Sequence, residues 1–392
     1  MLKPEIIREA TRLTQAGQLV EATALLQRML RGEDAADAFR AADRIALGAP
    51  SVVEATVNPV ADRTQPVAPD TARPGKLRGS LDRAGAGFGF RGAARRAPPA
   101  KQDIVPEGAR FIEDTYSNQA GSRSYRLFIP SGYQGQPIPL VVMLHGCTQS
   151  PEDFAAGTRM NFMAEERTCF VAYPAQRSDA NQSKCWNWFR SGDQRRGEGE
   201  PSLIAGITRK VLRDYSVDPA RVYVAGLSAG GAAAAVLGAT YADLYAAIGV
   251  HSGLACGAAV DLPSAFVAMR QGGGSDRIGN SGQAVRTIVF HGDRDTTVHP
   301  KNGAQFLDRA MQAASPHRRV QHGQVPGGHS YTRTIYGDAD GRGVVEHWNI
   351  HGAGHAWSGG SPAGSYTDPQ GPDATREMLR FFLEHPISGR GD

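Results

Sequence analysis

The stretch from Arg221 to Gly231 constrains the fold of this chain more than any other feature. It reads RVYVAGLSAGG, a short apolar run followed by Gly226, Ser228 and Gly230 and then by an alanine-rich segment. Valine and tyrosine favour strands, whereas alanine favours helix. A Cβ at either flanking glycine would keep the two elements apart. The stretch therefore predicts a buried strand, a tight turn centred on Ser228, and a helix.

Apolar runs and helical periods alternate through the chain after residue 105. Strands are expected from Phe111 onward and over 124–130, 139–144, 169–173, 222–225, 246–251, 287–290 and 344–350. Helices are expected at about 151–166, 201–215, 229–241, 301–314 and 373–385. This alternation predicts an α/β class with a mostly parallel central sheet and helices on both faces. Ligands of such folds bind beyond the carboxyl ends of the strands.

The residues before this region have a different character. Residues 1–34 show two amphipathic periods separated by Ala16-Gly17, which predicts a helical hairpin. A lone hairpin cannot bury its own apolar face, so it would dock on the main domain or self-associate. Residues 35–104 are rich in Gly, Pro, Ala and Arg without periodicity, which predicts a flexible linker. We therefore expect these two parts to precede an α/β catalytic domain over 105–392.

Charge, hydropathy and cysteine usage limit the function classes. The net charge is +4, and the excess arginine lies largely in the linker, so charge does not indicate nucleic-acid binding. No apolar run reaches the length of a membrane span, and the first residues lack the apolar core of a signal peptide. We therefore expect a cytoplasmic protein. Free thiols are then the expected state of the four cysteines, whose spacing fits no metal site: Cys147, Cys169, Cys185 and Cys256.

Gly-x-Ser-x-Gly between a strand and a helix is the pattern of a nucleophile elbow, in which a strained turn presents the serine at the sheet edge. The positive end of the following helix would lie behind Ser228 and favour a developing oxyanion. A glycine-rich turn that merely contains a serine is the alternative interpretation. On folds of this kind the acid and the histidine follow the nucleophile in chain order.

Candidates for the acid and the histidine lie in two later loops. Asp293 and Asp295 follow the strand that ends at Phe290. We expect Asp295 to orient the imidazole, because it lies farther into the loop, and Asp293 to support the turn by accepting backbone N–H bonds. His355 lies on a glycine-lined loop after the last strand and is expected to be general base and then general acid. Three other histidines are expected to pack or to support the site: His251, His329 and His351.

An oxyanion hole requires two backbone N–H groups near the nucleophile. One is expected from Ala229, directly after Ser228. The other is expected from the loop after the strand that ends at Leu144, where Gly146 would let the backbone turn and aim the N–H of Cys147 at the oxyanion. A plain strand-to-loop turn, with Cys147 as a packing residue, is the alternative.

Residues 174–200 form a long polar loop that contains Cys-Trp-Asn-Trp-Phe from Cys185. Aromatic rings supply apolar contact area, so Trp186 is a candidate wall of a substrate pocket. A hydrophobic plug that holds the loop down is the equal alternative. We expect substrate binding to involve Trp186 and His145, the first residue of the predicted oxyanion loop.

Five motifs occur in order along the chain: His-Gly-Cys-Thr-Gln, Cys-Trp-Asn-Trp-Phe, Gly-Leu-Ser-Ala-Gly-Gly, His-Gly-Asp-Arg-Asp-Thr-Thr-Val and Gly-Ala-Gly-His-Ala-Trp-Ser-Gly-Gly. Through them, residues 105–386 resemble the polyhydroxybutyrate-depolymerase-type esterases, which are similar to feruloyl and acetylxylan esterases. The resemblance implies an α/β-hydrolase fold with Ser228, Asp295 and His355 as a catalytic triad. It also implies hydrolysis of short hydroxyalkanoate or plant-cell-wall esters. An extracellular location, as in secreted relatives, is the alternative to a cytoplasmic one.

The leading hypothesis is a serine carboxylic-ester hydrolase that needs no metal or organic cofactor and acts on a small or oligomeric ester. Another acyl-transfer enzyme, such as a thioesterase or peptidase, is one alternative, because fold and triad do not fix the leaving group. A non-catalytic binding protein on the same scaffold is a second alternative, and it would be expected to have lost part of the triad.

Overall fold

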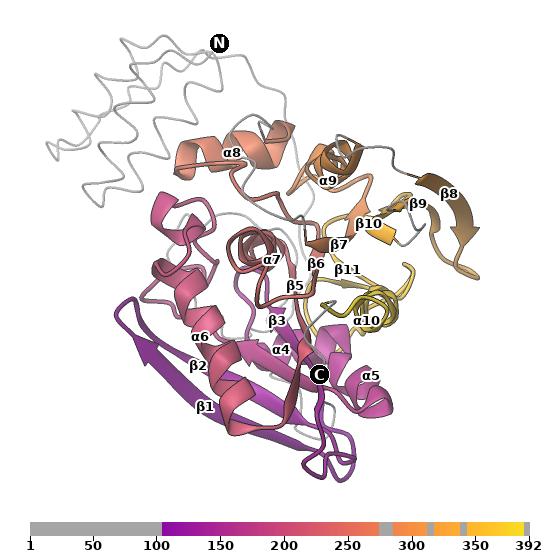
Figure 1. Cartoon of the computed structure of the whole chain (residues 1–392). Helices are drawn as coiled ribbons and strands as arrows, with labels where there is room; N and C mark the ends of the chain where they lie inside the picture. The colour runs from indigo at the N-terminus through magenta and orange to yellow at the C-terminus, as the bar shows by residue number, and fades with distance from the viewer. Residues whose placement is uncertain (1–103, 274–284, 312–316, 338–342, 388–392) are drawn as a thin grey trace, which may run out of the picture. The chain divides into compact units, whose positions relative to one another are not determined.

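The structure is a computed structural model that describes residues 104–273, 285–311, 317–337 and 343–387 (Figure 1). The helical hairpin predicted over 1–34 lies outside the described residues. So does the linker predicted over 35–104, apart from its last residue. The described residues therefore lie almost entirely in the predicted catalytic domain.

The described residues build a 10-stranded sheet in the order β1-β2-β4-β3-β5-β6-β7-β10-β9-β8. Neighbours from β4 to β10 are parallel, and antiparallel strands flank them at both edges. The strands are β1 (Arg110–Asn118), β2 (Gly121–Ile129), β3 (Ile138–Leu144), β4 (Phe170–Pro174), β5 (Val217–Leu227), β6 (Ala247–His251), β7 (Arg286–Gly292), β8 (His317–Gln324), β9 (Ser330–Gly337) and β10 (Gly343–Ile350). A separate parallel pair is formed by β11 (Trp357–Ser358) and β12 (Thr367–Asp368).

Helices cover both faces of this sheet (Figure 1). One face packs against α6 (Gly199–Asp214), α7 (Ala229–Thr240), α8 (Leu262–Gln271) and α9 (Lys301–Met311). The other face packs against α4 (Pro151–Thr158), α5 (Met160–Arg167) and α10 (Ala374–Leu383). Strand β3 is fully apolar because it packs against helical layers on both faces of the sheet. Leu140, Val142 and Leu144 face one layer, and Val141 and Met143 face the other. The predicted α/β class with a mostly parallel, doubly covered sheet is confirmed.

Two elements differ from the sequence prediction. The helix expected at 151–166 is two helices, because Arg159 adopts a left-handed conformation with φ 55° between α4 and α5. The hairpin of β8 and β9 was not expected. Strand β8 is exposed along nearly its whole length, so it shows no alternation of apolar and polar residues, and backbone pairing with β9 defines it.

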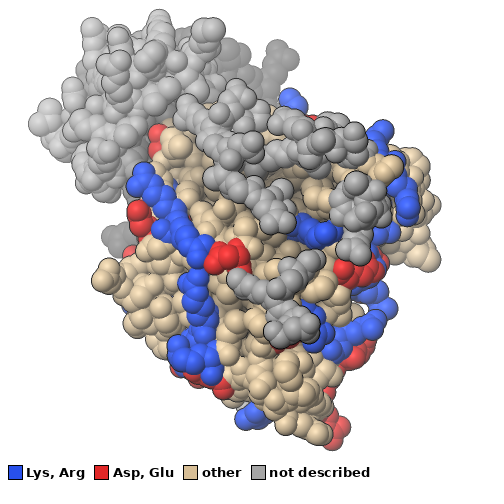
Figure 2. All heavy atoms as spheres, viewed as in Figure 1, with Lys and Arg blue, Asp and Glu red and all other residues tan. Residues whose placement is uncertain are grey.

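Basic side chains gather on one visible face of the molecule. Figure 2 shows Lys and Arg in a column near α6, with acidic side chains beside them. Arg196 pairs with Asp243, and Lys210 and Arg213 both pair with Asp214. These pairs neutralise much of the local positive charge.

None of the helices in the described ranges is long and apolar enough to cross a bilayer. The described residues also contain no group of three or more His, Cys, Asp and Glu side chains arranged to hold a metal ion.

Candidate active site

Ser228 occupies a strained turn between β5 and α7. Its backbone has φ 57° and ψ −119°, a region that non-glycine residues rarely adopt. The Ser228 N–H donates to the His251 carbonyl at 2.9 Å, and the Ser228 carbonyl accepts from Ala232 N–H at 3.0 Å. A Cβ on Gly230 would overlap the Leu144 carbonyl oxygen. The turn is thus held from the neighbouring strands, as the sequence pattern predicts.

Asp295 and His355 are brought together from the loops after β7 and β10. Asp295 Oδ2 lies 2.7 Å from His355 Nδ1. The Asp295 side chain has no exposed surface, and that of His355 is 10% exposed. Asp295 Oδ1 accepts the N–H groups of Thr297 and Val298 at 2.9 and 2.8 Å. The carboxylate is therefore fixed by its own loop while it holds the imidazole.

The charge of Asp295 defines the tautomer of His355. Burial alone would raise the pKa of Asp295, but hydrogen bonds with His291 and His355 outweigh it and hold that pKa below its usual range. The ionised carboxylate accepts the Nδ1 proton of His355, which leaves Nε2 as a free acceptor. His291, for which the sequence predicted no role, has its Nε2 2.8 Å from the Val298 carbonyl and 3.5 Å from Asp295 Oδ2.

The neighbouring aspartate has a different partner. Asp293 Oδ1 accepts Gly352 N–H at 2.7 Å, and its Oδ2 lies 3.0 Å from His351 Nδ1. The His351 ring contacts Thr332 Oγ1 through Nε2 at 2.9 Å. The side chains of Asp293 and His351 are 36% and 40% exposed, in contrast to the buried Asp295. Each aspartate thus pairs with its own histidine, and Asp293 also binds a backbone N–H, as expected of a turn-supporting residue.

His251 connects the serine turn to the histidine loop. Its carbonyl accepts Ser228 N–H, and its Nε2 accepts the N–H of Ser358 at 2.9 Å. The ring is fully buried and stacks against Phe290 and Trp357. Burial, followed by the nearby imidazoles of the site, lowers the pKa of His251 well below its usual value, so the ring stays neutral and can accept. His251 thus connects the Ser228 turn to Ser358, which lies three residues after His355.

The two predicted oxyanion donors lie at the ends of β3 and β5. Ala229 is the first residue of α7, where backbone N–H groups have no partner within the helix. Cys147 follows Gly146 in the oxyanion loop, residues 145–149. Within the described parts of the chain, neither Cys147 N–H nor Ala229 N–H donates to another protein group. Two free donors next to the elbow match the requirement for binding an oxyanion.

Residues 123–315 match the family described as Esterase PHB depolymerase. This range contains Ser228 and Asp295 and ends before His355. The segment is an Esterase PHB depolymerase domain. The resemblance to this family, which the motifs indicated, is thereby confirmed.

Named relatives agree with this assignment. The esterase domain resembles poly(3-hydroxyalkanoate) depolymerase C of Paucimonas lemoignei, with 33% identity over 58% of this chain and 56% of that protein. It resembles feruloyl esterase B of Thermothelomyces thermophilus, with 28% identity over 54% of this chain and 77% of that protein. An acetyl xylan esterase structure from Aspergillus awamori superposes with a TM-score of 0.54 at 20% identity, over 70% of this chain and 99% of the other. This superposition supports the predicted α/β-hydrolase fold. The chain spans little more than half the length of the depolymerase.

A disulfide in the esterase domain corrects the expectation of four free thiols. Cys147 of the oxyanion loop is bonded to Cys185 of the loop over 174–200, with Cα atoms 4.2 Å apart. Cys169 and Cys256 are not in disulfides. The sequence offered an even number of cysteines but no pairing signal, because the bonded residues are separated by 38 positions.

Trp186 and His145 lie inside the esterase domain and not at its surface. Trp186 is 0% exposed and His145 is 1% exposed. The Trp186 indole N–H donates to the His145 carbonyl at 3.1 Å. A side chain without exposed surface cannot contact a substrate in this conformation, so the prediction that these two residues bind substrate does not fit the structure. Trp186 fits the alternative of a plug beneath the loop.

His145 supports the oxyanion loop from below. Its Nε2 accepts Gln176 N–H at 3.1 Å, so Nδ1 carries the proton and donates to the Gly146 carbonyl at 2.7 Å. Burial lowers the pKa of His145 to about 4, which keeps the ring neutral. Gln149 also holds the loop, because its Oε1 accepts Gly146 N–H at 2.9 Å and its Nε2 donates to Asp153 at 2.9 Å.

Proposed function

We propose that this protein is a serine carboxylic-ester hydrolase in which Ser228, His355 and Asp295 form a catalytic triad. The observation that carries the proposal is the 2.7 Å contact between His355 Nδ1 and Asp295, together with the strained elbow that holds Ser228 at the end of β5. Neither a plain glycine-rich turn nor a binding protein that had lost catalysis requires this combination.

The chemistry follows from the positions of these groups. Ser228 Oγ attacks the ester carbonyl carbon while His355 Nε2 takes its proton, and the resulting imidazolium is stabilised by Asp295. The N–H groups of Cys147 and Ala229 bind the oxyanion of the tetrahedral intermediate. The ester C–O bond then breaks, and the alcohol leaves with the proton from His355. Water attacks the acyl-enzyme with the same proton transfers, which releases the carboxylic acid and restores Ser228.

We propose short hydroxyalkanoate esters, including oligomers of 3-hydroxybutyrate, as the substrate class. The support is the family match and the name of the Paucimonas lemoignei relative, a poly(3-hydroxyalkanoate) depolymerase. Feruloyl or acetyl esters are the second candidate, supported by the relatives named feruloyl esterase B and probable acetylxylan esterase A.

We also propose that the protein works in an oxidising compartment. Disulfides persist outside the reducing cytosol, and the bond between Cys147 and Cys185 lies at the proposed site. This favours the extracellular alternative over the cytoplasmic location expected from the sequence.

A substrate screen tests the proposed function. Purified full-length protein is assayed on p-nitrophenyl esters of increasing acyl length, on a soluble 3-hydroxybutyrate oligomer, on a feruloyl ester and on an acetylated xylan fragment. We expect the highest kcat/KM on the hydroxyalkanoate oligomer. Ser228→Ala should abolish hydrolysis of every substrate, whereas the exposed Ser191→Ala should match wild type. The proposal fails if no ester is hydrolysed or if Ser228→Ala retains the activity.

A further inference from the structure

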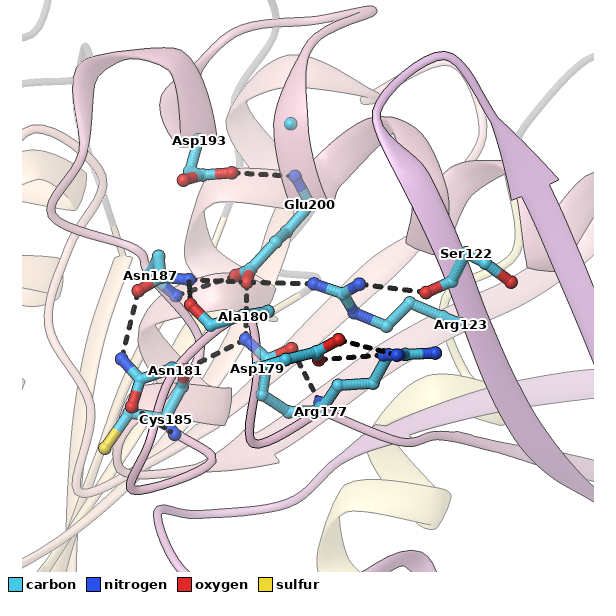
Figure 3. Close-up of polar contacts among 12 residues, drawn as sticks. Ser122, Arg123, Arg177, Asp179, Ala180, Asn181, Cys185, Asn187, Asp193 and Glu200 are labelled. Carbon is cyan, nitrogen blue, oxygen red and sulfur yellow. Dashed lines mark hydrogen bonds and ion pairs between the residues drawn. The ribbon is translucent and has the colours of Figure 1, made fainter.

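A buried carboxylate lies at the start of α6, directly after the loop that follows β4. Glu200 is 6% exposed, and its partners come from separate segments of the chain (Figure 3). Its Oε2 accepts Asn187 N–H at 2.7 Å, and its Oε1 accepts Asn187 Nδ2 at 2.7 Å. Oε1 also accepts Gln176 Nε2 and lies 3.4 Å from the Arg123 guanidinium. All of these partners donate, so the ionised carboxylate, which only accepts, is the form that fits.

Both a cation and a second carboxylate lie near Glu200. Arg123 is 6% exposed and is the cation that opposes Glu200. Asp193 is a second carboxylate nearby, because its Oδ1 accepts Glu200 N–H at 2.7 Å. Charged groups are buried only where partners compensate the loss of water, and the donors on Glu200 supply that compensation here.

Gln176 connects Glu200 to one side of the oxyanion loop. Its side-chain Nε2 donates both to Glu200 and to the Cys185 carbonyl, the latter at 2.9 Å. Its backbone N–H donates to His145 Nε2 at 3.1 Å. The orientation of Gln176 therefore sets both the ring of His145 and the backbone of Cys185.

Asn187 connects Glu200 to the other side of the oxyanion loop. The residue before it, Trp186, donates to the His145 carbonyl, and the residue before that, Cys185, is bonded to Cys147. The double contact of Asn187 with Glu200 fixes the backbone at this point. Glu200 thus holds two of the segments that contact residues 145–147.

We propose that Glu200 is a positioning residue that holds Cys147 N–H in place to bind the oxyanion, although it touches neither substrate nor triad. The proposal rests on the ester hydrolysis proposed above. It assigns to Glu200 a role in kcat, because a displaced oxyanion donor weakens the transition state more than the bound substrate.

Glu200→Gln is the test variant, because it keeps the volume but turns an NH₂ group toward donors. Glu198→Gln is the matched control, since Glu198 lies two residues earlier and its side chain is 53% exposed. We measure kcat and KM on a short p-nitrophenyl ester and count active sites with a phosphonylating agent. Per active site, Glu200→Gln should lower kcat roughly 10- to 100-fold with KM nearly unchanged, as expected when a catalytic group moves by about 1 Å. Glu198→Gln should match wild type.

Amide hydrogen exchange of residues 145–149 supplies a second readout that does not depend on turnover. Exchange in this loop should accelerate in Glu200→Gln and stay unchanged in Glu198→Gln. If wild type hydrolyses no ester but the loop exchanges faster in Glu200→Gln, the proposed function fails and the positioning role stands. If kcat per active site matches wild type, Glu200 is merely structural and the proposal is overturned.

A milder variant covers the case in which Glu200→Gln does not fold. Gln176→Met keeps the backbone N–H on His145 and removes the three side-chain contacts, with Glu200, the Cys185 carbonyl and Arg177 N–H. We expect a smaller fall in kcat and faster exchange in the oxyanion loop. Wild-type kcat together with wild-type exchange in a folded Gln176→Met would also overturn the proposal.

Discussion

The two sides of the candidate site are held by different means. Ser228, Asp295 and His355 stand directly after β5, β7 and β10, and much of their support comes from nearby backbone, such as the N–H groups of Thr297 and Val298 on Asp295. The oxyanion loop stands after β3 but is held by residues far along the chain. They include Gln176, Cys185, Trp186 and, through the buried Gln149, Ser365.

This difference predicts how replacing residues on each side should change the rate and the stability. A triad residue acts directly on the reacting atoms, so replacing it should remove most of the rate while the fold stays intact. A support of the oxyanion loop acts through packing, so replacing it should cost less rate but more stability.

The largest effect should come from the acid of the triad. Asp295→Asn should lower kcat roughly ten-thousand-fold, since the imidazole then loses the carboxylate that fixes its tautomer. Asp293→Asn should cost far less, because Asp293 contacts His351 and not His355. Steady-state kinetics of the two purified variants decide between them. A near-wild-type kcat in Asp295→Asn would contradict the expected difference between the two sides, because the triad would then tolerate the loss of its acid.

Removing the disulfide should have an intermediate effect. The Cys147→Ala/Cys185→Ala variant keeps the backbone N–H of residue 147 but releases the loop that carries it. We expect kcat to fall roughly 10- to 100-fold and stability to fall by about 2–4 kcal/mol. Cys169→Ala, which removes a buried cysteine outside the disulfide, is the kinetic control. Unchanged kcat in the double variant would show that the loop keeps its position without the cross-link.

Trp186→Ala should affect stability more than substrate preference. The side chain is fully buried in the core, so its truncation should cost about 3–5 kcal/mol of unfolding free energy. A thermal melt and relative kcat/KM values over an acyl series, on one preparation, measure both effects. A changed acyl preference without loss of melting temperature would instead support Trp186 as a residue of the substrate pocket.

His145 should give the smallest effect, visible as a pH dependence of stability. Burial lowers its pKa from 6.5 to about 4, so the unfolded chain binds a proton that the folded chain does not between these values. Its contribution is complete above about pH 6.5 and is lost as the pH falls toward about 4. His145→Gln should therefore show a shallower fall in unfolding free energy over this window than wild type. Parallel curves from denaturant titrations would contradict this account of His145.

The contrast also explains what the sequence could predict. The mostly parallel sheet and its two helical layers follow from the alternation of apolar runs and helical periods. The contact of His355 with Asp295 follows from short motifs placed at strand ends, where parallel strands deliver their loops to one edge. The disulfide and the roles of Gln176 and Glu200 could not be predicted, because they depend on segments that meet only in the fold. The same holds for His251, whose apolar strand gives no hint that its ring accepts a bond from Ser358.

Covalent trapping of the acyl-enzyme tests the central claim most directly. Wild type, Ser228→Ala and Asp295→Asn are mixed with excess p-nitrophenyl ester, quenched in acid within the first turnover and digested for mass spectrometry. The account predicts an acyl group on Ser228, in the peptide that follows Arg221, in wild type and no adduct on any residue of Ser228→Ala. Asp295→Asn should acylate at the same residue but more slowly. An acyl group on another residue of wild type, or an equal burst of p-nitrophenol from Ser228→Ala, would contradict the assignment of Ser228 as the nucleophile.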